Sequence, residues 1–180
     1  MARQNPKITE TVTETIKEEE DTIFSSLDMG YEEEDDIPYE YERIRLTELD
    51  DQETYTGRPV MTEVQSFTID DDGEEVTKYR CKLFLIDDEE EEMLEININL
   101  KTGNDTQTNI RKGAVLYDFI TSIKELESPG FASLFNRINK VDLKEFRDFI
   151  NDCSEATIKC LERQGGSFTY NSFIFTNIKG

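Results

Sequence analysis

A change of hydrophobic period near residue 113 is the feature that most constrains how this chain can fold. Before it, MLEININL (93–100) alternates strictly between apolar and polar side chains. After it, AVLYDFITSIKELESPG (114–130) repeats its apolar residues every three or four positions, at Leu116, Phe119, Ile120, Ile123 and Leu126. The first pattern predicts a half-buried strand and the second an amphipathic helix. The fold therefore has to bury a sheet face against a helix.

Two further strands are expected before residue 93. RPVMTEVQSFTID (58–70) is rich in β-branched and aromatic residues, and VTKYRCKLFLI (76–86) alternates with period two. The polar segments IDDDGEEV (69–76) and DDEEEE (87–92) have the composition of tight turns. These three strands predict an antiparallel meander.

The second half of the chain predicts a helical block, 114–152, followed by a hairpin. Ser128-Pro129-Gly130 ends the first helix, and FASLFNRI (131–138) forms a second short amphipathic segment. DLKEFRDFIND (142–152) starts with Asp142 and Glu145 in capping-box spacing. ATIKCLERQ (156–164) and SFTYNSFIFTNI (167–178) flank a Gly-Gly turn, which predicts a terminal β-hairpin.

The acidic charge is concentrated at the N-terminus. The chain has 180 residues and a net charge of −21, and residues 1–52 hold 17 acidic but only five basic side chains. Apolar residues are scattered through this region, so it buries too little surface to offset its ordering entropy. We expect residues 1–40 to be a disordered acidic tail and residues 41–180 to form the folded domain.

Composition argues against several functional classes. The chain has no histidine, so the most common general base and the Ser-His and Cys-His nucleophile pairs are missing. Three cysteines without Cys-x-x-Cys spacing do not indicate a zinc site. We therefore expect no enzyme activity, cofactor or metal. A carboxylate-metal nuclease is the remaining enzymatic alternative.

No apolar run approaches the ~18 residues that a membrane span needs, and the first residues lack the apolar core of a signal peptide. Three cysteines cannot all pair within one chain, which suits a reducing compartment. The expectation from these features is a cytoplasmic protein without a membrane partner.

The order of three strands, a helical block and two strands resembles OB-fold single-stranded-DNA-binding proteins of the archaeal and phage type. The resemblance covers roughly residues 55–178 and rests on strand order and hairpins. It implies a five-stranded Greek-key barrel with the helical block between strands 3 and 4. It also implies non-catalytic binding of single-stranded DNA in replication or recombination. The helical block is longer than one helix, which leaves an α+β sandwich as the alternative architecture.

The strand faces predict where nucleic acid would bind. Alternation places Lys78, Arg80, Lys82 and Phe84 on one face of 76–86. Lys159 and Arg163 share one side of 156–163, and Phe173 and Phe175 are expected to face outward, while Phe168 and Tyr170 face the core. Cations neutralise phosphates and rings stack on bases. The predicted nucleic-acid-binding residues are Lys78, Arg80, Lys82, Phe84, Lys159, Arg163, Phe173 and Phe175.

The same residues have a plainer interpretation. Lysine and arginine on a strand are ordinary solvated residues that discourage edge-to-edge aggregation, and the phenylalanines could pack beneath the helical block. The high acidic charge supports a second functional class, a protein-interaction or inhibitor module. Such a module would bind a basic protein partner, imitating nucleic acid.

The segment EEEDDIPYEYERIR (32–45) contains a candidate partner-binding motif. Its DDIPY stretch is similar to the acidic tip, ending in Ile-Pro-Phe, with which bacterial single-stranded-DNA-binding proteins recruit partner enzymes. Here a tyrosine replaces the phenylalanine, and the motif lies at the other end of the chain. The predicted partner-binding residues are Asp35, Asp36, Ile37, Pro38 and Tyr39.

The acidic tail could instead occupy the basic face of its own chain, which predicts tighter oligonucleotide binding after deletion of residues 1–40. The alternative is a solubilising leader that contacts nothing.

Overall fold

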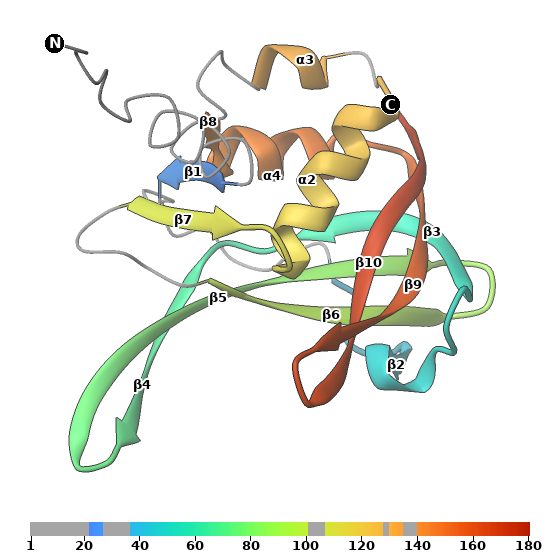
Figure 1. Cartoon of the computed structure of the whole chain (residues 1–180). Coiled ribbons are helices and arrows are strands. Elements are labelled where there is room, and N and C mark those ends of the chain that lie inside the picture. Colours follow the sequence, from blue (N-terminus) through green and yellow to red (C-terminus); the bar gives the residue numbers. More distant parts are fainter. Residues whose placement is uncertain (1–21, 27–36, 101–106, 128–129, 135–139) are drawn as a thin grey trace, which may run out of the picture.

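The computed structural model describes residues 22–26, 37–100, 107–127, 130–134 and 140–180 as a mainly β protein with its α-helices on one side of a curled sheet (Figure 1). The main sheet has seven strands: β2 (Glu42–Arg45), β3 (Thr54–Met61), β4 (Gln65–Asp71), β5 (Glu74–Asp87), β6 (Glu92–Leu100), β9 (Glu155–Gly165) and β10 (Phe168–Lys179). A smaller sheet contains β1 (Thr22–Ser26), β7 (Gln107–Arg111) and β8 (Lys140–Asp142). The helices are η1 (Leu46–Glu48), α2 (Val115–Glu125), α3 (Phe131–Leu134) and α4 (Leu143–Asn151).

The predicted meander is confirmed as β4–β5–β6, in which each neighbouring pair is antiparallel. The main sheet has the order β10-β9-β3-β5-β6-β2, with β4 beside the first half of β5. Asp72 and Gly73 form the β4–β5 turn with φ of 55° and 87°, the left-handed region that a two-residue hairpin needs. The terminal hairpin of β9 and β10 is also confirmed.

The expected strand 58–70 is divided into β3 and β4, a difference from the prediction. At the division, the Thr62 N–H donates to the Lys82 carbonyl (2.8 Å) and the Thr62 hydroxyl accepts from the Lys82 N–H (3.0 Å). The Asn151 side chain bonds both the N–H (2.6 Å) and the carbonyl (3.2 Å) of Met61. These contacts come from residues far along the chain. With β2 also in the sheet, it has seven strands where five were expected.

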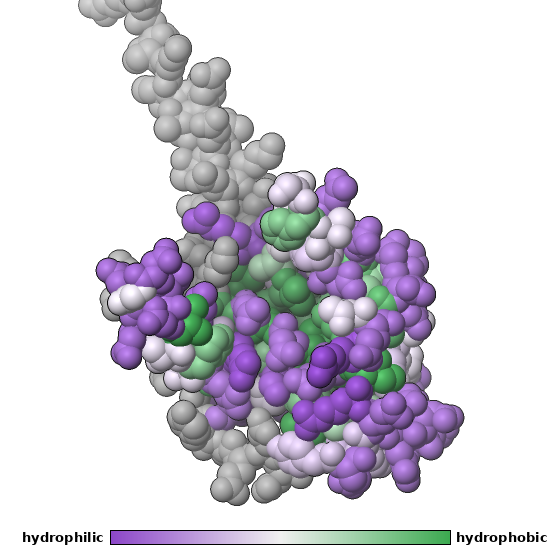
Figure 2. Space-filling model, turned by 90° about the horizontal axis from the view of Figure 1, so that it is seen from below, coloured by the Kyte–Doolittle hydropathy of each residue, from purple (hydrophilic) through white to green (hydrophobic). Residues whose placement is uncertain are grey.

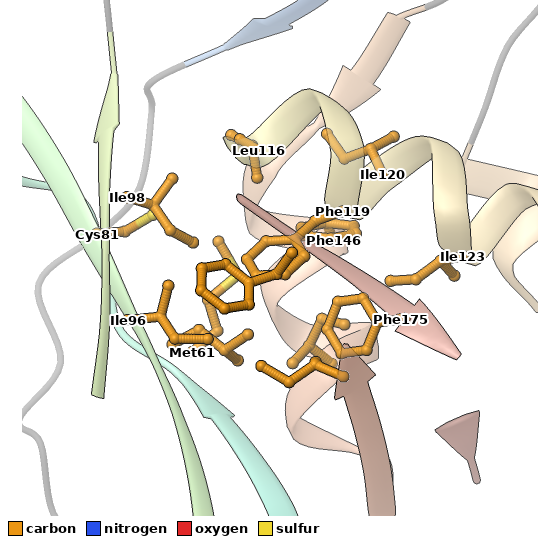
Figure 3. Close-up of a cluster of buried hydrophobic side chains, with 14 of the residues drawn as sticks. Met61, Cys81, Ile96, Ile98, Leu116, Phe119, Ile120, Ile123, Phe146 and Phe175 are labelled. Atoms are coloured by element: carbon orange, nitrogen blue, oxygen red, sulfur yellow. The ribbon is translucent and has the colours of Figure 1, made fainter. Parts of the chain in front are cut away.

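Alternation along β5 and β6 gives the main sheet two different faces. The inner face, which packs against α2 and α4, carries Cys81, Leu83 and Leu85 of β5. The outer face, on the other side, carries the residues between them. Figure 3 shows the inner core, where residues of β3, β5 and β6 meet Leu116, Phe119, Ile120 and Ile123 of α2 and Phe146 of α4. Burial of this core accounts for the position of the helices.

Two helices begin close to where the sequence predicted. Asp142 is the N-cap of α4, and its carboxylate accepts from the N–H groups of Lys144 (2.9 Å) and Glu145 (3.1 Å). The α2 helix also lies along β10, the last strand of the main sheet. There the Ser122 hydroxyl accepts a hydrogen bond from the Phe175 N–H (2.9 Å). This contact satisfies part of an edge that would otherwise be open.

Among the described residues, no helix could span a membrane.

The predicted orientation of the last strand is wrong. Phe173 is fully buried and Phe175 nearly so, and their rings lie 6.1 Å and 5.0 Å from the ring of Phe119 on α2. Phe168, expected in the core, is 64% exposed near the hairpin tip. Both faces of β10 carry apolar residues, so alternation alone did not identify the side that α2 covers.

The structure also differs from the predicted tail at two places. Residues 22–26 form β1, which pairs antiparallel with β7 and parallel with β8. Ile37 is 6% exposed. The partners of these residues are distant in sequence, and a count of local charge and hydropathy does not detect them. Residues 1–21 and 27–36 lie outside the described residues, so for them the tail stays a prediction.

Candidate functional site

Three cations follow one another along the outer face of β5, and we call Lys78, Arg80 and Lys82 the outer cationic row. Antiparallel pairing places Phe67 of β4 opposite Lys78, and Asn99 and Asn97 of β6 opposite Arg80 and Lys82. The helices α2, α3 and α4 lie on the other side of the sheet (Figure 1). The row is therefore aligned as alternation predicts, on a face that these helices do not cover.

Lys82 is neutralised within the sheet. Its ammonium lies 3.0 Å from the carboxylate of Glu95 on β6, and Arg43 of β2 lies 3.2 Å from the other oxygen. Partial burial alone would raise the pKa of Glu95, but the hydrogen bonds and charges of Lys82 and Arg43 outweigh it, so the pKa lies below its usual value. Glu95 therefore stays ionised at neutral pH, and Lys82 offers less charge to a ligand than the sequence indicated.

Arg80 and Lys78 are the cations of the row without an acidic partner among the described residues. The Arg80 guanidinium lies 5.0 Å from the centre of the Phe67 ring, within cation–π range. Its Nε is buried and has no hydrogen-bond partner within the described part of the chain. Lys78 is exposed. A ring with two adjacent cations can contact both a base and a phosphate.

Phe84 lies on the predicted face but is only 2% exposed. It belongs to a small outer cluster with Val60, Ile86 and Met93, which Ile37 covers. We call residues 37–41 the N-terminal strap, because its two ends, Ile37 and Tyr41, both pack against this cluster. The predicted stacking role of Phe84 therefore has no open ring face to act through. The sequence predicted an exposed ring at Phe84. It could not show that Ile37, which is distant in the chain, packs against that ring.

The other residues of the DDIPY motif have separate environments. Tyr39 is 59% exposed, and the Arg43 guanidinium lies 5.5 Å from its ring centre. The Pro38 carbonyl accepts from the Tyr41 N–H (3.2 Å). Asp35 and Asp36 lie outside the described residues.

Deletion of residues 1–40 would remove β1 and Ile37 as well as the acidic residues. The deletion would therefore not test the acidic residues alone.

Lys159 and Arg163 share the side of β9 that faces away from the core, as predicted, but they are not part of the outer cationic row. Lys159 pairs with Thr54 at the start of β3, whereas Lys82 bonds Thr62 just after its end. These points are eight residues apart along the strand, a path of roughly 25 Å. Arg163 lies 3.8 Å from Asp118 of α2. Phe173 and Phe175 are in the core, so they too are absent from this surface.

Phe67, Asn97 and Asn99 also belong to this surface, although the sequence patterns did not identify them as site residues. Asn97 and Asn99 could have been found from the alternation of 93–100, but identifying Phe67 required knowledge of the register between β4 and β5.

Figure 2 views the side opposite the α-helices and shows mostly hydrophilic side chains, with hydrophobic ones visible between them. No group of three metal-ligating side chains occurs within the described ranges.

The Glu95 pair predicts a pH-dependent contribution to stability. A carboxyl whose pKa is lower in the folded chain stabilises it above the unfolded pKa, and this contribution is lost as pH falls through the folded pKa. We expect Glu95→Gln to lower the urea midpoint at pH 7, and the difference from wild type to shrink as the pH falls below ~4. Urea unfolding at pH 7, 5 and 3 measures this. Asp72→Asn in the exposed turn is the control, and an equal effect of both variants at every pH would contradict the prediction.

Comparison with known proteins gives no relative from which a function could be transferred: no protein-family model, curated protein or solved structure matches this chain significantly.

Proposed function

We propose that this chain is a non-catalytic OB-like protein that binds single-stranded DNA through the outer cationic row and Phe67, in replication or recombination. The observation that carries the proposal is Arg80, which has no acidic partner among the described residues and lies 5.0 Å from the centre of the Phe67 ring, beside exposed Lys78. The aromatic contribution differs from the sequence-based expectation, because Phe67 replaces Phe84, Phe173 and Phe175.

The strand order supports the OB-like assignment. If β3 and β4 together count as the first strand, the run β10-β9-β3-β5-β6 has the order 5-4-1-2-3 of an opened OB barrel. OB-folds bind oligonucleotides on the face of strands 2 and 3, between the loops that follow strands 1 and 4. Here strands 2 and 3 are β5 and β6, and those loops are the β4–β5 turn and the β9–β10 turn. The parallel strand β2 and the small sheet are additions to that plan.

The chemistry of the row suits a single strand with little sequence preference. Lys78 and Arg80 would neutralise phosphates and release counterions. Phe67 would offer a ring to a base, a contact worth ~1–3 kcal/mol. Asn97 and Asn99 could bond base edges beside the cations. The acidic turns around the face would repel phosphate elsewhere and so restrict binding to this row.

Fluorescence anisotropy with labelled dT oligomers at two salt concentrations tests the proposal. We expect Arg80→Ala to weaken binding about tenfold, since it removes a charge and the partner of Phe67, a change of about 1.4 kcal/mol. Lys78→Ala should weaken binding and reduce the salt slope by about one.

Lys144→Ala is the matched control, because Lys144 is exposed on α4, on the helical side of the sheet. Equal affinities of the Arg80 and Lys144 variants would overturn the proposed site. Absence of salt-dependent binding in the wild type would overturn the function.

A second candidate is an acidic module that binds a basic protein. The net charge of −21 and the pairing of many cations favour it, because Arg43, Arg58, Lys82, Arg147, Arg163 and Lys179 all form ion pairs with acids. The acidic N-terminal region, including Tyr39, would then serve partner contact or regulation. This candidate predicts no oligonucleotide binding even at low salt.

A further inference from the structure

The β4–β5 hairpin forms an arm that projects from the body of the protein, as Figure 1 shows. We use the name arm for residues 65–80. Within the described part of the chain, β4 pairs with β5 and with no other strand. Among the described residues, no strand therefore covers the other edge of β4 from Ser66 to Asp71. Open strand edges are templates for pairing with another chain.

The turn identifies which backbone groups face this open edge. Asp71 and Glu74 flank the two-residue turn, and such a flanking pair is hydrogen-bonded. Bonded and non-bonded pairs alternate along an antiparallel ladder. The N–H and carbonyl groups of Ser66, Thr68 and Asp70 consequently point away from β5. They form a regular row of donors and acceptors.

The arm carries opposite charges at its two ends. Its tip holds Asp70, Asp71, Asp72, Glu74 and Glu75, and its base holds Lys78 and Arg80. Two arms that lie antiparallel would bring the acidic tip of each toward the basic base of the other. Two arms in parallel would place tip against tip. The charge pattern is therefore complementary to a second copy of itself in the antiparallel direction.

We propose that β4 pairs antiparallel with β4 of a second copy of this chain, with Thr68 opposite Thr68 of that copy. In this register Phe67 meets Ile69 and Ser66 meets Asp70 across the two-fold axis. No acid lies opposite another acid, whereas centring the axis on Asp70 would oppose two aspartates, a destabilising arrangement. The two-fold axis is perpendicular to the joined sheet. Both outer cationic rows would therefore face the same side of the dimer.

The pairing involves seven residues from each copy and buries little surface, so it belongs to the weak, concentration-dependent class of interfaces. Each copy also carries a net charge of −21, which opposes association over long range. At physiological ionic strength, charges beyond a Debye length of about 8 Å are largely screened. Association should therefore be measured near that ionic strength.

Cysteine cross-linking tests the register directly. All three native cysteines are buried, and burial raises the pKa of the Cys81 thiol to about 12, so an introduced surface cysteine is the reactive one. Opposed Thr68→Cys residues would have Cα atoms about 5.5 Å apart, within disulfide range.

Thr77→Cys is the matched control, since Thr77 is the exposed partner of Thr68 on β5. Its two copies would lie about 14 Å apart. Mild oxidation should give a covalent dimer of Thr68→Cys at least tenfold faster than of Thr77→Cys; equal rates would overturn the proposal.

Sedimentation equilibrium tests the association without a cross-link. The wild-type mass should rise with concentration from 20.9 kDa toward twice that value. Thr68→Lys should abolish the rise because it places two like charges opposite each other, and Thr77→Lys should not. A wild type that stays monomeric, or a Thr68→Lys variant that associates as the wild type does, would overturn the proposal. Oligonucleotide binding by monomeric Thr68→Lys protein shows separately whether the proposed function stands.

Discussion

Phe173→Ala is expected to lower the free energy of unfolding by about 3–5 kcal/mol, the range for removing a buried phenylalanine ring. The side chain is 0% exposed, and its ring centre lies 6.1 Å from that of Phe119. Truncation would leave a cavity between β10 and α2. The backbone there is held by the Ser122–Phe175 hydrogen bond of 2.9 Å, which limits collapse of the cavity. Urea unfolding followed by circular dichroism measures the change.

Phe168→Ala is the control for this prediction. The two phenylalanines lie on the same strand, but Phe168 is exposed near the hairpin tip. Its loss should change stability by about 0.5 kcal/mol or less. The comparison also separates the two roles that the sequence allowed for Phe173. A base-stacking residue would lose oligonucleotide binding and keep its stability, and that outcome would contradict the core assignment.

Gly57→Ala is expected to destabilise the fold by about 1–3 kcal/mol, the usual range for overpacking. A Cβ at this position would lie 2.8 Å from both the backbone nitrogen and the carbonyl oxygen of Ile86 on β5. Gly57 pairs with Ala156 of β9, and the next residue, Arg58, pairs with Ile86. The methyl group would therefore act where β3 passes from one neighbouring strand to the other. Backbone atoms cannot move aside as a flexible side chain can, so the strands have to separate.

The same measurement on Gly180→Ala provides the control. That position has no atom within 4 Å of an added Cβ, and it lies at the last residue of the chain. The two substitutions add the same group and differ in what surrounds it. An unfolding midpoint of Gly57→Ala equal to that of Gly180→Ala would show that an added Cβ at residue 57 does not lie 2.8 Å from the Ile86 backbone.

The buried position of Phe173 bears directly on the proposed function, because it decides which rings remain on the surface. Phe84, Phe173 and Phe175 are buried in the two hydrophobic clusters, which leaves Phe67 as the ring beside Lys78 and Arg80, the cations of the row without an acidic partner among the described residues. Lys82 contributes less than the sequence suggested because Glu95 lies 3.0 Å away. The candidate site is therefore narrower than the predicted set of residues and is centred on Lys78, Arg80 and Phe67.

Local sequence patterns were sufficient to predict the features that depend on neighbouring residues. Alternation predicted β5 and β6, and repetition every three or four residues predicted α2. The polar segment 69–76 with Gly73 predicted the β4–β5 turn. In the structure Gly73 has a φ of 87°, a conformation that glycine adopts without strain. Asp142 predicted the start of α4 because its carboxylate reaches the next N–H groups. The shared face of Lys78, Arg80 and Lys82 followed from the period of two.

Features whose partners lie far apart in the chain depended on long-range packing. The side of β10 that faces the core was decided by α2, because apolar residues occupy both faces of that strand. The division of 58–70 depended on Asn151 and Lys82, the burial of Phe84 on Ile37, and the neutralisation of Lys82 on Glu95. Period and composition report the local preference of a segment. Burial and charge pairing depend on which distant segments pack against it, and no local pattern contains that information.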